Sequence, residues 1–128
     1  MIVDSSALVS VVLKESGYEA LVEKLKGAEV LYVATPTAVE SAIVLSSRLR
    51  FDARSLLAGL LHRMSAKIVD FNQEHYEAAV SAYLRFGKGR HAAGLNFGDC
   101  MSYALAAVSG LPLLYTGTDF SHTDIQSA

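Results

Sequence analysis

The chain opens with Met1-Ile2-Val3-Asp4-Ser5-Ser6-Ala7-Leu8: a short apolar run, one aspartate, and then residues that favour a helix. The apolar run predicts a short buried strand. Ser5 and Ser6 are good N-cap residues and predict a helix over residues 7–13. An acidic residue is therefore expected where the first strand passes into the first helix.

Strands and helices alternate along the whole chain. The apolar segments 30–34, 67–71 and 112–116 predict three further strands, and the tail is expected to add one short edge strand. Capping residues and apolar periodicity predict helices that begin near Tyr18 (with a capping box from Ser16 to Glu19), Thr35, Asp52, Gln73 and Asp99. This order predicts a parallel sheet covered by helices on both faces, with ligands bound beyond the carboxyl ends of the strands.

The 128 residues correspond to one domain, and 52% hydrophobic residues with a mean hydropathy of +0.31 supply ample material for a core. No apolar run reaches the roughly 18 residues that span a bilayer, and nothing at the N-terminus resembles a signal peptide. The single cysteine, Cys100, excludes an internal disulfide and fits a reducing cytosol. We therefore expect a cytoplasmic protein with no membrane partner.

The net charge of −2 does not indicate a general nucleic-acid binder. Lys88 and Arg90 nevertheless form a local basic group in a glycine-rich loop, 87–98, that could hold a phosphate backbone. A second basic group fits a solvated helix surface equally well; it comprises Arg48, Arg50, Arg54, Arg63 and Lys67.

Four acidic residues stand beside apolar segments: Asp4, Glu40, Asp99 and Asp119. Asp4 and Asp119 follow strands, and Glu40 lies one helical turn beyond another. Two carboxylates 4 Å apart repel by about 1 kcal/mol in water and by roughly 4 kcal/mol at an effective dielectric constant of 20. A fold that collects several usually holds a cation, and oxygen ligands select Mg²⁺ or Mn²⁺, ions typical of phosphoryl chemistry.

Each acid also has a purely structural interpretation. Asp4 and Asp99 fit helix N-caps, Glu40 fits a solvent-facing helix position, and Asp119 fits an Asx-turn. One shared site accounts for all four positions more economically than four separate structural roles.

Four segments together resemble the motifs of PIN-domain ribonucleases, and most closely the VapC toxins of bacterial type II toxin–antitoxin pairs. They are Ile2–Leu8, Pro36–Glu40, Asn96–Cys100, and Leu113–Phe120 with Thr123–Ile125. Any one motif is weak, but four in order at these spacings are a strong signal. The resemblance implies a single PIN domain over 1–128, a three-layer α/β/α sandwich whose central, mostly parallel sheet has four to five strands.

The resemblance also implies an activity: a metal-dependent endoribonuclease toxin that hydrolyses phosphodiester bonds of transfer, ribosomal or messenger RNA and so inhibits translation and growth. Asp4, Glu40, Asp99 and Asp119 would be its catalytic residues and would bind Mg²⁺ or Mn²⁺. A VapB-type antitoxin would neutralise it, and a homodimer or a larger toxin–antitoxin oligomer is expected.

Weaker candidates surround these four acids. Ser6, Thr116 and Thr118 could hydrogen-bond the ligand carboxylates. Asp124 is a fifth acid that either supports the site or shares the role of Asp119, and Asp119 is favoured because it directly follows a strand. Lys88 and Arg90 are the expected RNA contacts.

Helices 18–26 and 52–64 carry many aliphatic residues for so small a domain. Most must be core, and the excess predicts a dimer surface and a groove for a helical antitoxin segment. An antitoxin arginine placed among the carboxylates would mimic or displace the metal.

Two alternatives remain open at this point. A catalytically weak PIN-fold module would only bind a partner, although the four intact acids argue against it. A phosphoacceptor receiver domain has a similar length and acidic pocket, but it needs a lysine after its last-but-one strand, and no lysine follows Lys88. A haloacid-dehalogenase phosphatase is not among them, because it needs Asp-x-Asp where this chain has Asp4-Ser5-Ser6, and the second aspartate of its catalytic pair is missing.

Overall fold

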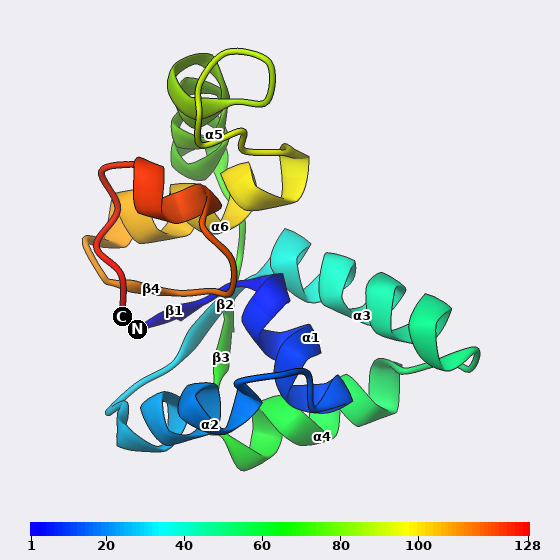
Figure 1. Ribbon diagram of the computed structural model, residues 1–128. Coiled ribbons are helices and arrows are strands. Elements are labelled where there is room, and N and C mark those ends of the chain that lie inside the picture. Colours follow the sequence, from blue (N-terminus) through cyan, green and yellow to red (C-terminus); the bar gives the residue numbers. More distant parts are fainter.

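A central sheet of four parallel strands, in the order β3-β2-β1-β4, organises the chain (Figure 1). The computed structural model describes all 128 residues. Its strands are β1 (Ile2–Val3), β2 (Tyr32–Ala34), β3 (Lys67–Val69) and β4 (Leu113–Leu114). Ile2 pairs with both Tyr32 and Leu113, so β1 is an inner strand and the residue after it lies in the middle of the sheet edge.

Helices cover both faces of this sheet, which confirms the predicted three-layer α/β/α class. They are α1 (Ser5–Leu13), α2 (Tyr18–Gly27), α3 (Thr35–Leu49), α4 (Arg54–Arg63), α5 (Gln73–Phe86) and α6 (Phe97–Ser109), with a 3₁₀ helix, η1 (Asp119–His122). In Figure 1, α5, α6 and η1 lie on one side of the strands and α1, α2 and α4 on the other.

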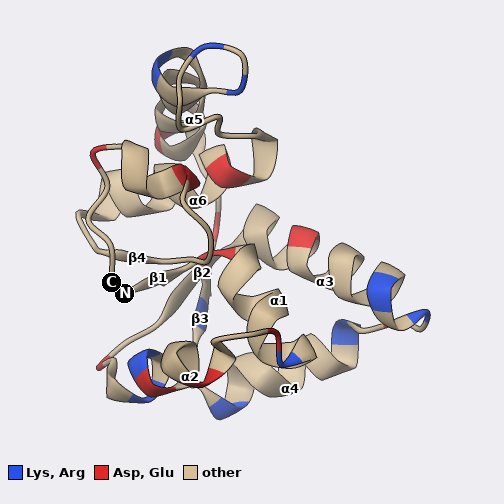
Figure 2. Cartoon of the chain, in the orientation of Figure 1, with Lys and Arg blue, Asp and Glu red and all other residues tan.

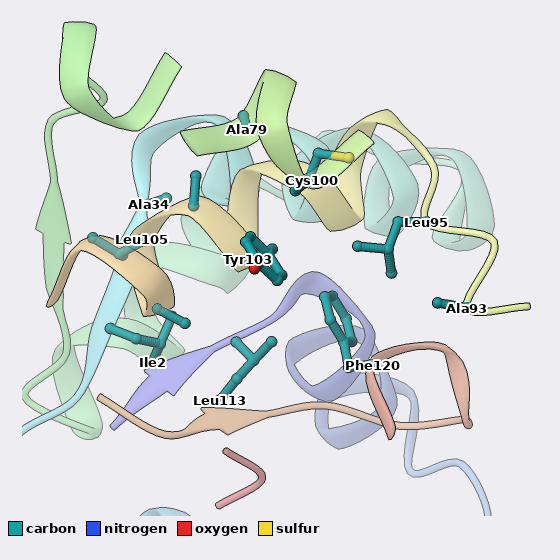
Figure 3. Packing of buried hydrophobic residues seen from close by; sticks show 13 residues of the cluster. Ile2, Ala34, Ala79, Ala93, Leu95, Cys100, Tyr103, Leu105, Leu113 and Phe120 are labelled. Carbon is teal, nitrogen blue, oxygen red and sulfur yellow. The ribbon is translucent and has the colours of Figure 1, made fainter. Parts of the chain in front are cut away.

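Two hydrophobic clusters, one on each face, hold the layers together. Successive strand residues point to opposite faces, so Ile2 and Leu113 enter the cluster beneath α5 and α6, whereas Val3 and Leu114 enter the cluster beneath α1, α2 and α4. Figure 3 shows the first cluster, in which side chains from β1, β4, α6 and η1 meet. Phe120 belongs to it and fixes η1 against the sheet.

Several element boundaries differ from the predictions because other residues provide the caps. The first helix begins at Ser5 because Asp4 is its N-cap and accepts from Ser6 N. The sixth begins at Phe97 because Asn96 is its N-cap. The capping box expected before α2 is absent, since Gly17 occupies the N-cap with φ of 85° and no side-chain hydrogen bond. α5 begins at Gln73 as predicted, with Asn72 as its N-cap.

The tail adds no strand to the sheet. Ser127 forms only an isolated parallel bridge with Leu113, so the expected edge strand is reduced to one pair of residues. β4 likewise spans Leu113–Leu114, shorter than the predicted 112–116.

The apolar surface does not lie where the sequence indicated. α2 exposes none of the large hydrophobic side chains, and α4 exposes only Leu56, because residues such as Leu57 and Leu61 pack into the core. These two helices therefore offer little fully exposed apolar surface for the predicted interface. The exposed side chains gather instead on α3 and α5, at Val39, Ile43, Tyr76, Val80, Tyr83 and Leu84. None of the helices has the length and apolar character that a membrane crossing requires.

Candidate active site

Asp4 lies at the carboxyl end of β1 and is almost fully buried, with 2% of its surface exposed. Its Oδ2 accepts from Ser6 N at 2.9 Å and from Ser6 Oγ at 2.6 Å. Its Oδ1 accepts from Ser102 Oγ at 2.6 Å. Asp4 is thus the N-cap of α1 and also a buried acid with one oxygen that takes only a single hydrogen bond.

Glu40 projects from α3 toward the start of α6. Its Oε1 accepts a hydrogen bond from Ser5 Oγ. The rest of the carboxylate lies directly against Gly98, where the methyl group of an alanine would overlap Glu40 Oε2. The absence of a side chain at Gly98 therefore leaves the space that the Glu40 carboxylate occupies.

Asp99 is the third residue of α6 and forms a capping box with Asn96. Asp99 N donates to Asn96 Oδ1, and Asn96 N donates to Asp99 Oδ2, both at 2.9 Å. Asp99 therefore helps to cap the helix without being its N-cap, and the structural and functional interpretations of this acid are compatible. Its Oδ1 makes no hydrogen bond within the protein.

The electrostatics of Asp99 show that the four acids share one environment. Burial raises the pKa of Asp99, the hydrogen bond from Asn96 N opposes this, and the charges of Asp4, Asp119 and Glu40 add to the rise, so that the pKa of Asp99 is about 6. Figure 2 shows these acidic segments at the β1–α1 junction, on α3, at the start of α6 and in the 3₁₀ segment. The fold thus brings together the four acids that the sequence predicted.

Asp119 is exposed at the first position of η1. The next residue, Phe120, is buried and packs its ring 5.0 Å from that of Tyr115, centroid to centroid. This anchor fixes the backbone at Asp119 and leaves its carboxylate free.

Ser6 links Asp4 to the segment after β4. Its hydroxyl donates to Asp4 and accepts from Thr116 N at 3.1 Å. The backbone N–H of Thr116 therefore reaches Asp4 only through the Ser6 hydroxyl, whereas the sequence assigned its side chain a direct contact with a ligand carboxylate. The hydroxyls of Thr116 and Thr118 make no hydrogen bond to any of the four acids, so this part of the prediction is wrong.

Asp124 belongs to a different cluster. It accepts from Tyr103 OH at 2.7 Å and from Arg85 Nη2 at 2.8 Å. The hydrogen bond from Tyr103, and then that from Arg85, lower the pKa of Asp124. Both oxygens of Asp124 accept hydrogen bonds from residues of α5 and α6. The charge of Asp119, in contrast, helps to raise the pKa of Asp99.

The loop between α5 and α6 carries the basic candidates. Lys88 N donates to Leu95 O at 2.9 Å, and the Arg90 guanidinium lies 5.6 Å from the centre of the Tyr83 ring. Both side chains are exposed at the tip of the molecule, beyond α5 (Figure 2).

The chemistry of the acids fits a hard divalent ion. All the donors are carboxylate or hydroxyl oxygens, and none of the four acids forms a salt bridge. No three His, Cys, Asp or Glu side chains converge closely enough to surround an ion directly. Mg²⁺ suits this spacing because it typically keeps several waters and takes only one or two carboxylates directly.

Two further features were not found from the sequence. Thr37 and Ser102 are buried hydroxyls on α3 and α6, and their oxygens lie 3.0 Å apart. A groove of about 1070 Å³ between α3, α5 and α6 is lined mainly by apolar side chains, including Val39, Tyr76 and Phe97. Each hydroxyl lies three residues from an acid on the same helix, but no local signal shows that the two hydroxyls meet or which helices border a groove.

Comparison with known proteins gives consistent results. The PIN domain family model matches residues 1–126. Ribonuclease VapC30 of Mycobacterium tuberculosis is 40% identical over 125 residues, which cover 98% of this chain and 95% of that protein. Ribonuclease VapC of Mycolicibacterium smegmatis is 44% identical over 125 residues, with 98% and 97% coverage.

Two solved structures share the fold. VapC20 of Mycobacterium tuberculosis, described as a sarcin-ricin loop cleaving toxin, matches with a TM-score of 0.80 at 15% identity, covering 99% of this chain and 97% of the other. A toxin–antitoxin complex from Klebsiella pneumoniae contains a chain that matches with a TM-score of 0.69 at 18% identity, with 96% and 92% coverage. At these identities the two structures support the fold alone.

Proposed function

This chain belongs to the PIN domain family and is a VapC-type ribonuclease, and from that premise we propose that it is an Mg²⁺- or Mn²⁺-dependent endoribonuclease toxin whose site is formed by Asp4, Glu40, Asp99 and Asp119. Its cleavage of RNA would arrest translation and growth. Membership of the family also removes the receiver-domain alternative.

One observation carries the assignment of the site. Asp99 lies within the fields of Asp4, Asp119 and Glu40, and no lysine or arginine forms a salt bridge with any of these four acids. Such a concentration of negative charge costs stability unless a cation offsets it. A divalent cation would meet that requirement, and it could also attract the anionic phosphodiester of an RNA substrate.

The roles of the acids follow from their surroundings. A bound Mg²⁺ would lower the pKa of a water molecule and polarise the scissile phosphate. Asp4, through Oδ1, and Asp119 would bind the ion, directly or through water. Asp99, with its pKa raised to about 6, can accept the proton of the attacking water near neutral pH, and Glu40 is the other carboxylate within the site that can do so.

The protein surroundings would also bind the RNA. α6 begins at Phe97, and the partial positive charge of its N-terminus favours a phosphate beside Asp99. Lys88 and Arg90, exposed on the loop before α6, would contact the RNA backbone farther from the cut.

Two protein partners belong to this proposal. The first is a VapB-type antitoxin with an arginine that enters the acidic site, where it would supply the positive charge that the protein itself lacks. The second is another copy of this chain, which would cover the exposed apolar side chains of α3 and α5 and the groove between them. We place the dimer there, and not on α2 and α4, because Leu56 is the only large hydrophobic side chain that those two helices expose.

The dimer is tested by light scattering of the purified protein after size-exclusion chromatography. Val80 is 44% exposed on α5 and lines the groove. Val80→Glu should yield monomers where the wild type elutes as a dimer. A wild-type monomer at high concentration would overturn this part of the proposal and leave the ribonuclease assignment intact.

The activity is tested by incubating total RNA with wild type and with Asp4→Asn, in Mg²⁺, in Mn²⁺ and in EDTA. Discrete fragments are expected from the wild type with either metal, and none from the variant or in EDTA. Asp52→Asn is the matched control, because Asp52 is an exposed acid outside the site that pairs with Arg54. Folded wild type that cleaves nothing would instead favour a module that only binds a partner.

A further inference from the structure

A chain of buried hydroxyls lies directly beneath the acidic site. Thr37 of α3 is 2% exposed and Ser102 of α6 is 0% exposed, and their hydroxyl oxygens lie 3.0 Å apart. Ser102 Oγ also lies 2.6 Å from Asp4 Oδ1. Three separate elements, α3, α6 and the end of β1, therefore meet at one dry hydrogen-bonded junction.

The direction of the hydrogen bonds is determined by proton count. An ionised carboxylate only accepts, so the single hydroxyl proton of Ser102 is donated to Asp4. The oxygen of Ser102 must then accept from Thr37, although the distance alone would allow either donor. The chain runs in one direction, from Thr37 through Ser102 to Asp4.

The same count identifies the oxygen of Asp4 that can bind a ligand. Oδ2 accepts two hydrogen bonds from Ser6, which use both of its lone pairs. Oδ1 accepts only the bond from Ser102 and keeps one lone pair free. Ser102 thus donates a hydrogen bond to Asp4 Oδ1, the carboxylate oxygen that remains available for a ligand.

The spacing along the two helices connects this junction to the other acids. Glu40 follows Thr37 by three residues on α3, and Asp99 precedes Ser102 by three residues on α6. Residues three apart lie on the same face of a helix. Each helix therefore presents one hydroxyl and one acid toward the same region, and the hydroxyl contact fixes how the two helices approach each other.

We infer that Thr37 and Ser102 are positioning residues, which set the spacing of Asp4, Glu40 and Asp99 and orient Asp4 Oδ1 toward the divalent ion. This inference rests on the proposed metal-dependent function. Neither hydroxyl touches substrate, because both are buried below the carboxylates. Their removal should weaken metal binding more than it weakens the fold.

Thr37 offers a matched pair of variants. Thr37→Val keeps the shape of the side chain and removes the hydroxyl, whereas Thr37→Ser keeps the hydroxyl and removes a methyl group. Ser41→Ala is the control for a buried hydroxyl on the same helix, since Ser41 is 0% exposed and bonds only to the carbonyl oxygen of Thr37. Ser102→Ala removes the central hydroxyl itself.

The measurement is the dissociation constant for Mn²⁺, taken from the electron paramagnetic resonance signal of free Mn²⁺ with full-length protein. Partners of metal-binding side chains typically contribute 10- to 100-fold in affinity. Thr37→Val and Ser102→Ala should weaken Mn²⁺ binding by about tenfold or more, whereas Thr37→Ser and Ser41→Ala should stay within about twofold of the wild type. Thermal unfolding of each variant verifies that the protein is folded at the temperature of the titration.

The results separate the two proposals. Equal Mn²⁺ affinity in Thr37→Val and the wild type, or equal weakening in Ser41→Ala, would overturn the positioning role while RNA cleavage stands. A wild type that binds Mn²⁺ with the expected dependence on Thr37 but cleaves no RNA would overturn the function and leave the positioning role. If Ser102→Ala does not fold, the two Thr37 variants still decide the question.

Discussion

The molecule holds two groups of acidic side chains in opposite ways. In the candidate active site, Asp99 has a pKa raised to about 6, mainly by burial and also by the charges of Asp4, Asp119 and Glu40. Asp124, only 25 residues later in the chain, has a lowered pKa because Tyr103 and Arg85 donate hydrogen bonds to it. The first group lacks a positive partner within the protein, and the second has one.

This difference is the one expected between an acid that binds a ligand and an acid that stabilises the fold. A carboxylate paired with an arginine and a phenol is satisfied within the chain and needs nothing further. The carboxylates around Asp99 raise its pKa, and an added cation would relieve the repulsion between their charges. The comparison predicts that changes in the first group affect catalysis and changes in the second affect stability.

The largest effect is expected from Asp99→Asn. The substitution removes a charge from the metal site but keeps an oxygen that can accept from Asn96 N. We expect RNA cleavage in Mg²⁺ to fall by at least about a hundredfold, because the electrostatic contribution of a bound metal is several kcal/mol and 1.4 kcal/mol corresponds to tenfold. The free energy of unfolding in EDTA should hold or rise, since repulsion is reduced.

Initial cleavage rates and urea unfolding, measured on the same preparations, check this prediction. Asp52→Asn, an exposed acid paired with Arg54, should leave the cleavage rate unchanged. Wild-type rates in Asp99→Asn would remove Asp99 from the site.

The second effect concerns Gly98, which has no side chain and so leaves room for the Glu40 carboxylate. In Gly98→Ala the new methyl group would overlap the Glu40 carboxylate and displace it. Misplacement of a catalytic group by about 1 Å can cost up to about a hundredfold in rate, so we expect cleavage to fall by about ten- to a hundredfold. The helix itself should gain stability, because alanine is the better helix former by roughly 0.5–1 kcal/mol.

Gly59→Ala is the control for this prediction. Gly59 lies within α4, where the added methyl group would meet only the end of the Arg63 side chain at 3.3 Å. It should change stability slightly and cleavage not at all. A Gly98→Ala protein that cleaves as fast as Gly59→Ala would show that the position of Glu40 is not critical.

The sequence was sufficient to predict the four parallel strands, the six helices and where the four acids stand beside them, because these depend on local patterns. An acid at the end of an apolar run marks the carboxyl edge of a strand wherever the strand lies. The contact between Ser102 and Asp4 joins residues 98 positions apart, and a serine within a helix carries no local signal of such a partner. Long-range hydrogen bonds of this kind require the packed structure.

The apolar surface was also beyond prediction from periodicity. The aliphatic face of α4 and the apolar residues of α5 have similar helical spacing, but Leu57 is buried and Leu84 is 55% exposed. Periodicity shows which residues share a face, whereas the neighbouring elements decide whether anything covers that face. For the same reason, the sequence favoured Asp119 over Asp124 only by its place after a strand, and the fold adds that Asp124 contacts Arg85.

The third prediction concerns pH. A carboxyl group whose pKa rises on folding, from 3.8 to about 6 for Asp99, binds its proton more tightly in the folded state, so the folded protein loses stability as pH rises through that range. As pH rises through this range, we expect the ionisation of Asp99 to lower the free energy of unfolding in EDTA by on the order of 1–2 kcal/mol, after allowance for solvent screening. Asp124 has the opposite effect, because its pKa is lowered in the folded protein. Its contribution to stability is present at pH values above its ordinary pKa and is lost as pH falls.

Urea unfolding of wild type and Asp99→Asn at pH 4, 5, 6 and 7, with EDTA throughout, isolates the contribution of Asp99 as the difference between the two curves. The variant should lose relative stability toward pH 4 and gain it toward pH 7. Parallel curves would mean that the environment of Asp99 does not penalise its charge.

The smallest effect on cleavage, and the sharpest test of the comparison, is expected from Asp124→Asn. This substitution weakens the hydrogen bonds from Tyr103 and Arg85, and we expect stability to fall by about 1 kcal/mol, with the cleavage rate within about twofold of the wild type. Tyr103→Phe removes the same phenol contact, so the double variant should be less destabilised than the sum of the two single variants. Thermal unfolding and initial cleavage rates measure both effects. If cleavage collapsed in Asp124→Asn but survived in Asp119→Asn, the catalytic role would pass to Asp124, and a salt bridge would no longer distinguish a structural acid from a catalytic one in this protein.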